Sequence, residues 1–220
     1  MIANPSRSSS HKRAPGRPRS HQARQSILDS TLELLQQTGF EALSIEGIAA
    51  HAGVGKATVY RWWPNKAAVV IDAFLTWVEP ELHFPKAPTV REQIMLQMRR
   101  LTKLMRGQFG TVLAAMIGAG QSQPEMLEAI RTKWLEPRRK EARVIVQQAQ
   151  ERGEIRSDIP ADTILDILYA PLYFRLLIGH ASVDLTLVDA VFAMATNGLD
   201  GGSNNKPRNH RRHSTHAELN

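Results

Sequence analysis

The sequence predicts an all-α protein with two helical domains: an N-terminal three-helix domain containing a helix-turn-helix, and a larger C-terminal helical domain. Three observations lead to this fold class. Apolar residues recur at helical spacing through most of residues 24–199. No alternating apolar and polar run bounded by turns indicates a strand. A proline-rich stretch at residues 79–88 then separates residues 24–78 from residues 79–199.

The two ends of the chain differ in composition from the body. The chain has 220 residues, 28 Lys and Arg, 21 Asp and Glu, and a net charge of +7. Residues 1–24 supply six of these charges and residues 201–220 supply three, which leaves residues 25–200 at −2. We therefore expect a disordered basic arm over residues 1–23, a disordered basic tail over residues 200–220, and a polyanionic partner.

Several classes of protein are excluded by what the sequence lacks. It contains no cysteine, which excludes a disulfide scaffold, a cysteine metal site and a thiol nucleophile. No apolar run reaches the roughly 18 residues of a membrane span, and the N-terminus has no apolar signal segment. We expect a cytoplasmic protein with no membrane partner.

The first two helices are predicted from their apolar faces and their caps. The first helix carries an apolar stripe and ends at Gly39, after which Phe40 folds back onto it. Ser44 is a favourable N-cap for a short second helix. The inward residues of the two helices are Ile27, Leu28, Thr31, Leu34 and Leu35, then Ile45, Ile48 and Ala49.

A tight turn at Ala52-Gly53-Val54 leads to a third helix over residues 55–61, with Val59 facing inward. Pro64 ends this helix. Asn65 caps a fourth helix, whose inward residues are Val70, Ile71, Phe74 and Val78.

The C-terminal domain is predicted to consist of helices throughout. Thr89 and Glu92 form a capping box for the next helix. Further helices cover residues 107–120 and 124–153, and Pro137 is expected to kink or split the second of these. A strongly apolar helix over residues 160–178 is expected to be interrupted by Pro171 and stopped by Gly179. The last helix covers residues 184–197 and ends at Asn197-Gly198.

Residues 44–66 have the composition of a DNA-reading helix-turn-helix. The second helix of such a unit must be short and must carry small and polar side chains, so that its backbone approaches base edges. An ordinary three-helix bundle with solvated polar residues is the alternative reading of the same spacing. The candidate DNA-contacting residues are Ser44, Gly55, Lys56, Ala57, Thr58, Tyr60, Arg61, Trp62 and Lys66.

The residues themselves favour the DNA-binding reading. The stretch Gly39-Phe40, Ile48-Ala49, Ala52-Gly53-Val54, Thr58-Val59-Tyr60-Arg61 and Lys66 resembles the N-terminal domain of the TetR/AcrR family of transcriptional regulators. The resemblance implies that Tyr60 and Lys66 bind phosphate. Gly55 departs from the Ser or Thr usual in the family, and Trp62-Trp63 replaces its usual aromatic-Phe pair. Trp63 is expected in the core and Trp62 at the DNA-facing edge.

The basic arm is a second candidate contact. Gly16-Arg17-Pro18-Arg19 is expected to be extended, because a residue before proline avoids the helical region. It looks like an AT-hook core, so Arg17 and Arg19 are candidates for lying in a narrow minor groove. A solvated tail is the alternative.

The C-terminal half resembles one subgroup of C-terminal domains attached to TetR-type regulators, through Arg106-Gly107, Val112-Leu113, Trp134 to Arg139, Arg152-Gly153-Glu154 and Pro171 to Arg175. The resemblance implies an effector-binding and dimerisation domain. The candidate pocket residues are Met105, Phe109, Met116, Trp134, Tyr169 and Tyr173, with Met98 and His180 as further possibilities. The candidate dimer contacts are Leu168, Leu172, Leu176, Leu187, Val191 and Phe192. An entirely intramolecular core is the alternative for each set.

No enzyme motif is present. Gly53-Val54-Gly55-Lys56 fails as a phosphate loop because Ala50 and Ala57 stand at required positions and no strand precedes it. His210, His213 and His216 lie in the tail and make a poor metal site. We therefore expect no cofactor or metal. The sequence predicts a ligand-responsive repressor that binds a palindromic operator as a homodimer with an unknown small-molecule effector. The alternative is a helical protein that binds nucleic acid nonspecifically through its basic tails.

Overall fold

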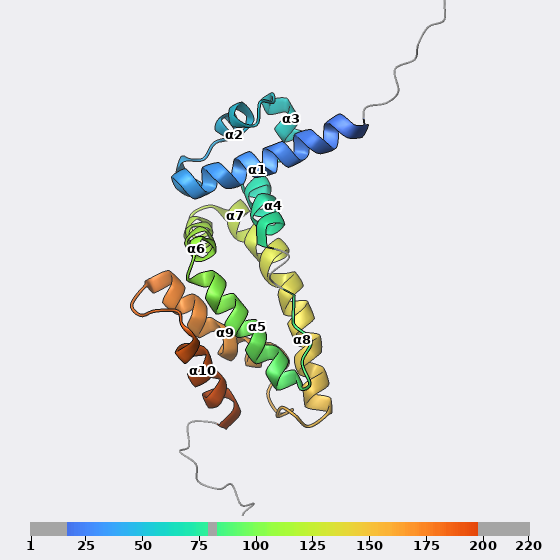
Figure 1. Cartoon of the computed structure of the whole chain (residues 1–220), viewed down its shortest axis with the longest axis vertical. Coiled ribbons are helices and arrows are strands. Elements are labelled where there is room, and N and C mark those ends of the chain that lie inside the picture. The colour runs from blue at the N-terminus through green and yellow to red at the C-terminus, as the bar shows by residue number, and fades with distance from the viewer. Residues whose placement is uncertain (1–16, 79–82, 198–220) are drawn as a thin grey trace, which may run out of the picture.

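The computed structural model describes residues 17–78 and 83–197, and within these ranges all regular structure is helical (Figure 1). Within the same ranges, no helix has both the length and the apolarity that crossing a membrane requires. The N-terminal helices are α1 (Arg17–Ala42), α2 (Ile45–His51), α3 (Lys56–Tyr60) and α4 (Lys66–Val78). The absence of strands agrees with the all-α fold class predicted from the sequence.

The start of α1 differs from the sequence-based expectation. The helix begins at Arg17, so residues 17–23 are helical and the expected extended Arg17-Pro18-Arg19 is wrong. Pro18 occupies the first turn, where its missing N–H has no partner to lose and its fixed φ suits the helix. Residues 1–16 and 198–220, and with them most of the expected arm and all of the tail, lie outside the described residues.

The predicted helix boundaries in this half are confirmed by the backbone and by two caps. Gly39 adopts φ 77°, a conformation that breaks the helical path, and Phe40 beyond it is buried. The Ser44 hydroxyl accepts a hydrogen bond from the Gly47 N–H at 3.0 Å. The Asn65 side chain accepts one from Ala68 at 2.8 Å.

The C-terminal part starts at α5 (Val90–Met105), which Thr89 caps by accepting a hydrogen bond from the Glu92 N–H. The elements that follow are α6 (Gln108–Gly120), α7 (Pro124–Ala129), the π-helix η2 (Ile130–Leu135), α8 (Glu136–Glu151), α9 (Ala161–Ile178) and α10 (Leu185–Asn197). Gly179 ends α9 in the left-handed conformation, as predicted.

The two prolines predicted to break helices behave differently. The segment over residues 124–153 is split, as predicted, into α7, the π-helical turn η2 and α8, and Pro137 lies in the first turn of α8. Pro171, in contrast, lies inside α9, and the helix continues unbroken through it. The predicted interruption is therefore wrong. Leu168 and Leu172, on either side of Pro171, are both buried, and this packing holds the helix together despite one lost backbone hydrogen bond.

Helix α4 joins the two halves of the molecule. It runs from beneath α1 towards α7 and η2, while α5, α8, α9 and α10 form the opposite end (Figure 1). Phe74 of α4 packs against Phe109 of α6 and Trp134 of η2, with ring centroids 5.3 and 5.2 Å apart. The buried residues of both halves therefore form one continuous hydrophobic core.

The start of α6 offers a test of this packing. A Cβ atom at Gly110 would lie 1.9 Å from the Met105 carbonyl oxygen, so the backbone at the α5–α6 turn would have to move. Gly110→Ala should therefore lower the free energy of unfolding by about 2 kcal/mol or more, as measured by urea denaturation.

Gly118 is the matched control in the same helix. It is exposed, and a Cβ there meets nothing within 4 Å. Gly118→Ala should stabilise the protein by roughly 0.5–1 kcal/mol through helix propensity. Equal effects of the two substitutions would contradict the close approach of α5 and α6.

Candidate DNA-binding site and effector pocket

Helices α2 and α3 form a compact helix-turn-helix. The turn between them passes through Gly53 at φ 66°, and the Val54 N–H donates to the Ala49 carbonyl at 2.9 Å. Ile48 and Val59 are fully buried and fix the two helices against the rest of the bundle. The Ser26 hydroxyl of α1 donates to the Ala52 carbonyl at 3.2 Å and ties the turn to α1.

The structure brings most of the candidate DNA-contacting residues to one exposed end. Tyr60 is 49% exposed and Trp62 is 41% exposed, although both are large aromatic side chains. Thr58 is half-buried beside them. The remaining members that are exposed at this end are Gly55, Lys56, Ala57 and Arg61. Tyr60 at the end of α3 and Trp62 two residues further on are exposed in a position that suits contact with phosphate and sugar.

An acidic partner for Lys56 was missed by sequence reasoning. The Lys56 ammonium forms an ion pair with the carboxylate of Glu46 in α2, and both groups are exposed. Hydrogen bonding from Lys56 lowers the pKa of Glu46, and the same bond raises the pKa of Lys56. Lys56 therefore stays charged, and a DNA phosphate must compete with Glu46 for it. The signal in the sequence that could have revealed this ion pair is Glu46, an acidic residue within the predicted DNA-reading unit.

Ser44 and Lys66 are partly used within the chain. The Ser44 hydroxyl is the N-cap of α2, and the Lys66 ammonium donates to the Phe40 carbonyl at 3.0 Å while lying 4.1 Å from the Phe40 ring centroid. Both residues remain at helix N-termini, where backbone N–H groups favour phosphate. Their side chains are held in place before any DNA arrives.

Trp63 is buried, as predicted, and it belongs to a network that the sequence did not reveal. Its indole N–H donates to Asp72 of α4 at 2.8 Å. Asp72 also accepts from Lys133 of η2 at 2.8 Å and lies 3.7 Å from the Arg24 guanidinium of α1. One carboxylate thus contacts Trp63 just beyond α3, the first helix and the C-terminal domain. The partners are too far apart in the sequence for a local motif.

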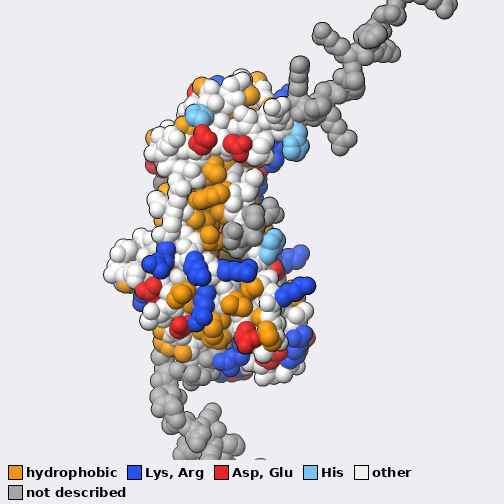
Figure 2. Space-filling view, viewed as in Figure 1, with side chains coloured by type: hydrophobic (Ala, Val, Ile, Leu, Met, Phe, Trp, Pro, Cys, Tyr) orange, Lys and Arg blue, Asp and Glu red, His pale blue; other side chains and the backbone are white. Residues whose placement is uncertain are grey.

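On the face of the molecule that Figure 2 shows, surface charge does not mark the helix-turn-helix. Figure 2 shows one face of the molecule, on which Lys and Arg side chains gather over the C-terminal domain rather than over α2 and α3. The candidate arm residues Arg17 and Arg19 lie in α1, at a position where their side chains are not described. The exposure of particular residues, and not net charge, identifies the candidate DNA-binding surface.

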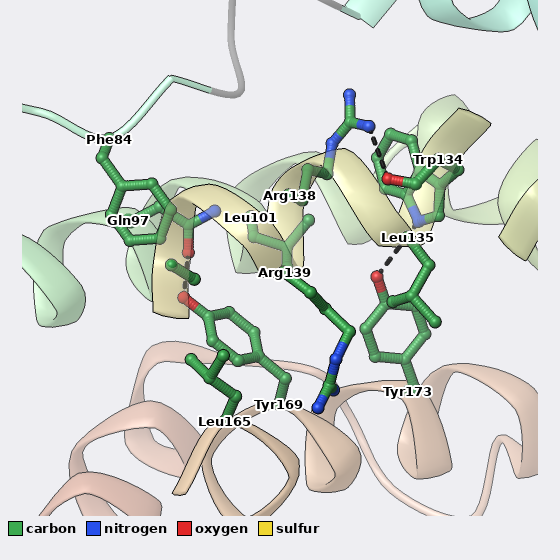
Figure 3. A pocket seen from close by; sticks show the side chains of 11 residues that line it. Phe84, Gln97, Leu101, Trp134, Leu135, Arg138, Arg139, Leu165, Tyr169 and Tyr173 are labelled. Carbon is green, nitrogen blue, oxygen red and sulfur yellow. Dashed lines mark hydrogen bonds between the residues drawn. The ribbon is translucent and has the colours of Figure 1, made fainter. Parts of the chain in front are cut away.

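The C-terminal domain contains a cavity of about 70 Å³ between α5, η2, α8 and α9 (Figure 3). Of the predicted pocket residues, Trp134, Tyr169 and Tyr173 line it. Sequence reasoning missed the other lining residues, which come from four separate segments: Phe84, Gln97, Leu101, Leu135, Arg138, Arg139, Ala142 and Leu165.

Met105, Phe109 and Met116 do not line this cavity, and their role as pocket residues stays a prediction. All three are buried in the core, and Phe109 stacks on Phe74 and lies 5.7 Å from the Trp134 ring. The two further candidates do not line it either: Met98 is fully buried core, and His180 is exposed beside Phe174. Large apolar residues are equally suited to a core and to a pocket wall, so composition did not separate the two.

The polar groups of the cavity are fixed by hydrogen bonds. Tyr169 donates its hydroxyl to the Gln97 side-chain oxygen at 2.6 Å, and the Trp134 indole N–H donates to the Tyr173 hydroxyl oxygen at 3.3 Å. Arg138 donates to the Trp134 carbonyl at 2.7 Å and places its guanidinium carbon 3.8 Å from the Trp134 ring centroid. Burial raises the pKa of both tyrosines, so both phenols are neutral.

One side of the cavity is braced by ion pairs. Arg139 and Arg143 of α8 both donate to the Asp162 carboxylate of α9 at 2.8–3.0 Å. Hydrogen bonds from Arg143 and then Arg139 lower the pKa of Asp162. This cluster fixes α9 against α8 and neutralises the charge of Arg139.

Most of the predicted dimer contacts are turned inward. Leu168, Leu172, Leu187, Val191 and Phe192 are buried within the chain, and Leu176 is half-buried. A side chain already packed in its own subunit offers little area to another, so the burial of this set does not favour it as an interface, and its role in dimerisation stays a prediction. The exposed large apolar residues of α9 and α10 are Ile167, Phe174, Leu177, Ile178 and Met194. Helix α9 is apolar nearly all round, so its sequence did not indicate which face was free.

The fold and the site together define a two-domain helix-turn-helix regulator, with a small DNA-binding unit connected through α4 to a helical domain that contains a cavity. Known proteins support this class. A family model described as bacterial regulatory proteins, tetR family, matches residues 27–73, and one described as tetracyclin repressor-like, C-terminal domain, matches residues 84–195.

Individual relatives agree with the family models. The HTH-type transcriptional regulator YdeS of Bacillus subtilis is 34% identical over 188 residues, covering 86% of this chain and 95% of that protein. The crystal structure of the TetR family transcription regulator SCO0332 is 34% identical with a TM-score of 0.70, covering 81% of this chain and 98% of that one. The chain belongs to the TetR family of transcriptional regulators, which bind DNA and respond to ligands.

A more distant structure shares the fold alone. FadR of Bacillus subtilis in complex with stearoyl-CoA is 17% identical with a TM-score of 0.63, and the match covers 80% of this chain and 98% of that one.

Lys56 provides a test of the DNA-binding surface. Lys56→Ala should weaken binding to specific DNA and reduce the slope of log K against log salt by about 1, because one phosphate contact is lost. The measurement is a fluorescence anisotropy titration over a salt series. Glu46→Gln should act in the opposite direction, because it removes the intramolecular competitor.

Lys103, which is exposed in α5, supplies the control. If Lys103→Ala lowers the affinity and the salt slope as much as Lys56→Ala does, α3 is not the DNA-contacting element.

Proposed function

We propose that this chain is a homodimeric, effector-responsive repressor that reads a palindromic operator with α2 and α3. The observation that carries the proposal is the exposed surface of Lys56, Tyr60, Arg61 and Trp62 on a helix-turn-helix whose buried face is complete. None of these side chains is buried, and the only ion pair of Lys56 within the described residues is the exposed one with Glu46, so this surface is accessible to a partner. The half-sites of a dimeric helix-turn-helix protein lie ~34–36 Å apart on DNA.

Base and phosphate contacts are divided between the ends of the unit in this proposal. Lys56 and Thr58 face base edges or nearby phosphates. Tyr60 binds the DNA backbone, as do the N-termini of α2 and α4 at Ser44 and Lys66. Gly55 has no side chain and, with nothing within 4 Å of a Cβ there, leaves the start of α3 open to close approach by DNA. Arg17 and Arg19 would add phosphate contacts from the start of α1.

Dimerisation uses the exposed face of α9 and α10. Ile167, Phe174 and Ile178 follow one another along one side of α9, and Phe174 is 57% exposed. Met194 of α10 is exposed as well. An exposed apolar face of this kind is typical of a protein interface, and a two-fold axis through it would pair the two recognition helices.

The effector acts through the contacts between the cavity and α4. Trp134 lines the cavity and packs on Phe74, and its neighbour Lys133 pairs with Asp72, which holds Trp63 just after α3. An effector that binds better when Trp134 has moved would shift α4 and the recognition helices of both subunits. Its differential affinity for the two arrangements sets the loss of operator affinity.

The proposal is tested by a gel shift on the DNA just upstream of this protein's own gene, with excess nonspecific competitor. Regulators of this kind often control their own or a neighbouring gene. We expect competitor-resistant binding that Tyr60→Phe and Lys56→Ala weaken, since both remove contacts of the helix-turn-helix.

Random-sequence selection extends this test to operators elsewhere. A chain lacking residues 1–16 and 201–220 serves as the control for the tails. If affinity disappears with this truncation and the two point variants bind normally, the protein binds nucleic acid through its tails and the repressor proposal is wrong.

The dimer face has its own test. Phe174→Glu should convert the dimer to a monomer in sedimentation velocity, because a buried carboxylate without a partner is costly. Leu96→Glu on α5 is the matched control, since Leu96 is a similarly exposed apolar residue (43%) on another helix. A Phe174→Glu protein that remains dimeric, or a monomeric Leu96→Glu protein, would place the interface elsewhere.

A further inference from the structure

Glu46 differs in charge from the rest of the helix-turn-helix, since it is the only acidic residue among residues 44–66. It lies in the first turn of α2, and its side chain is 61% exposed. Helices α2 and α3 lie on the outer side of α1, away from α4 and the C-terminal domain (Figure 1). A carboxylate on a surface that approaches DNA repels the phosphates and lowers the affinity for every sequence. An acid at this position therefore calls for a gain other than affinity.

Folding stability does not supply that gain. Helix α2 is already capped by Ser44, whose hydroxyl accepts a hydrogen bond from the Gly47 N–H at 3.0 Å, so the start of the helix does not need the Glu46 side chain. The Glu46 carboxylate pairs with the Lys56 ammonium, and the Lys56 side chain is 50% exposed. Ion pairs with this exposure contribute little to folding, because water solvates both charges whether or not they are paired.

The ion pair instead fixes a donor beside an acceptor at the open end of the unit. Lys56 is the first residue of α3 and follows Glu46 by ten residues, so the pair spans the turn between α2 and α3. Gly55 precedes it in an extended conformation, and a Cβ atom there would meet nothing within 4 Å. The hydrogen bond lowers the pKa of Glu46 and raises the pKa of Lys56, so both groups are charged at neutral pH.

An ammonium paired with a carboxylate matches the major-groove edge of a G·C base pair. One N–H of Lys56 is donated to Glu46 and two remain for another partner, while a carboxylate accepts several hydrogen bonds at once. Guanine presents two adjacent acceptors, N7 and O6, and the N4 donor of cytosine lies next to them. An A·T pair places its donor between two acceptors and ends in a methyl group, so it fits two N–H groups beside a carboxylate less well.

The pairing also changes the balance between phosphate and base contacts. An ammonium that is shared with a carboxylate gains less from a phosphate than a free ammonium does. Its hydrogen bonds to the uncharged base edges keep their direction. The carboxylate therefore lowers the affinity for nonspecific DNA more than the affinity for the correct site, and specificity is the ratio of the two.

We infer that Glu46 is a specificity-determining residue and that, together with Lys56, it reads one G·C base pair in each half-site of the operator. This inference rests on the proposed DNA-reading role of α2 and α3. Lys56 donates to N7 and O6 of the guanine, and Glu46 accepts from N4 of the cytosine on the opposite strand. The same carboxylate opposes the binding of Lys56 to phosphates at incorrect sites.

Selection of operators from random-sequence DNA by the full-length protein tests this inference, with unrelated DNA as the nonspecific reference. The Lys56→Ala protein identifies the base pair that Lys56 reads, as the position at which the selected sequences lose their preference. We expect this position to be G·C in the operators that the wild type selects. Its replacement by A·T should weaken wild-type binding about tenfold in fluorescence anisotropy.

Glu46→Gln should lose the preference at the same base pair. The Gln amide presents a donor as well as an acceptor, so it does not distinguish cytosine N4 from thymine O4. The variant should bind unrelated DNA more tightly than the wild type does, because a negative charge is removed. Its ratio of specific to nonspecific affinity should fall about tenfold. Circular dichroism and thermal unfolding check that each variant is folded.

Glu33→Gln is the matched control, since it removes the same charge from another exposed side chain of the N-terminal domain. Glu33 lies in α1, where its carboxylate is 3.6 Å from the imidazole of His51. This variant should change the affinities for operator and for unrelated DNA by the same factor, and it should select the same sequences as the wild type does.

Three results overturn the inference. In the first, Glu46→Gln raises both affinities equally and selects the wild-type sequence, which would make Glu46 only a competitor of DNA for Lys56. In the second, Lys56→Ala relaxes no position or relaxes an A·T pair. In the third, the two variants relax different positions. The proposed function stands in all three cases if the wild type selects an operator, whereas a wild type that enriches no sequence overturns the proposed function itself.

Discussion

The rest of the structure depends on the burial of α4 from two sides. Its residues Val70, Ile71 and Phe74 are fully buried, and they are covered by α1 on one side and by α6, α7 and η2 on the other. Neither half of the molecule completes its hydrophobic core without this helix. Close-packed interiors resist compression, so a displacement passes through them as a rigid-body shift. Helix α4 therefore forms a rigid connection between the cavity and the helix-turn-helix.

Asp72 of α4 adds polar contacts between the same parts of the molecule. It is only partly buried, and it accepts hydrogen bonds from Trp63 and Lys133 while Arg24 lies nearby. A single carboxylate therefore contacts α1, Trp63 just beyond α3, and η2. The π-helical turn in η2 lies between this carboxylate and the cavity, and such turns recur at functional sites because they displace side chains from regular helical positions. The exposed residues of α3 stay accessible because the core of the bundle is complete without them.

Local patterns predicted the helices well where capping chemistry was explicit. Ser44, Asn65 and Thr89 each cap the helix that their position indicated, and Gly39 and Gly179 both adopt positive φ at the predicted ends. The predictions went wrong where distant packing decided the outcome. Pro171 stays inside a helix because neighbouring leucines are buried. Residues 17–23 are helical for a local reason that the prediction overlooked, since a proline fits the first turn of a helix.

The sequence by itself determined the all-α fold class, the helix-turn-helix and the resemblance to TetR-type regulators, because these depend on short-range periodicity, caps and a local motif. Only the tertiary structure decided which apolar residues line the cavity, which face of α9 is free, and that Glu46 holds Lys56 while Asp72 joins three segments. Side-chain type is the same on a core face, a pocket wall and an interface. Which of these a residue occupies depends on partners tens of residues away, and that information appears only when the chain is folded.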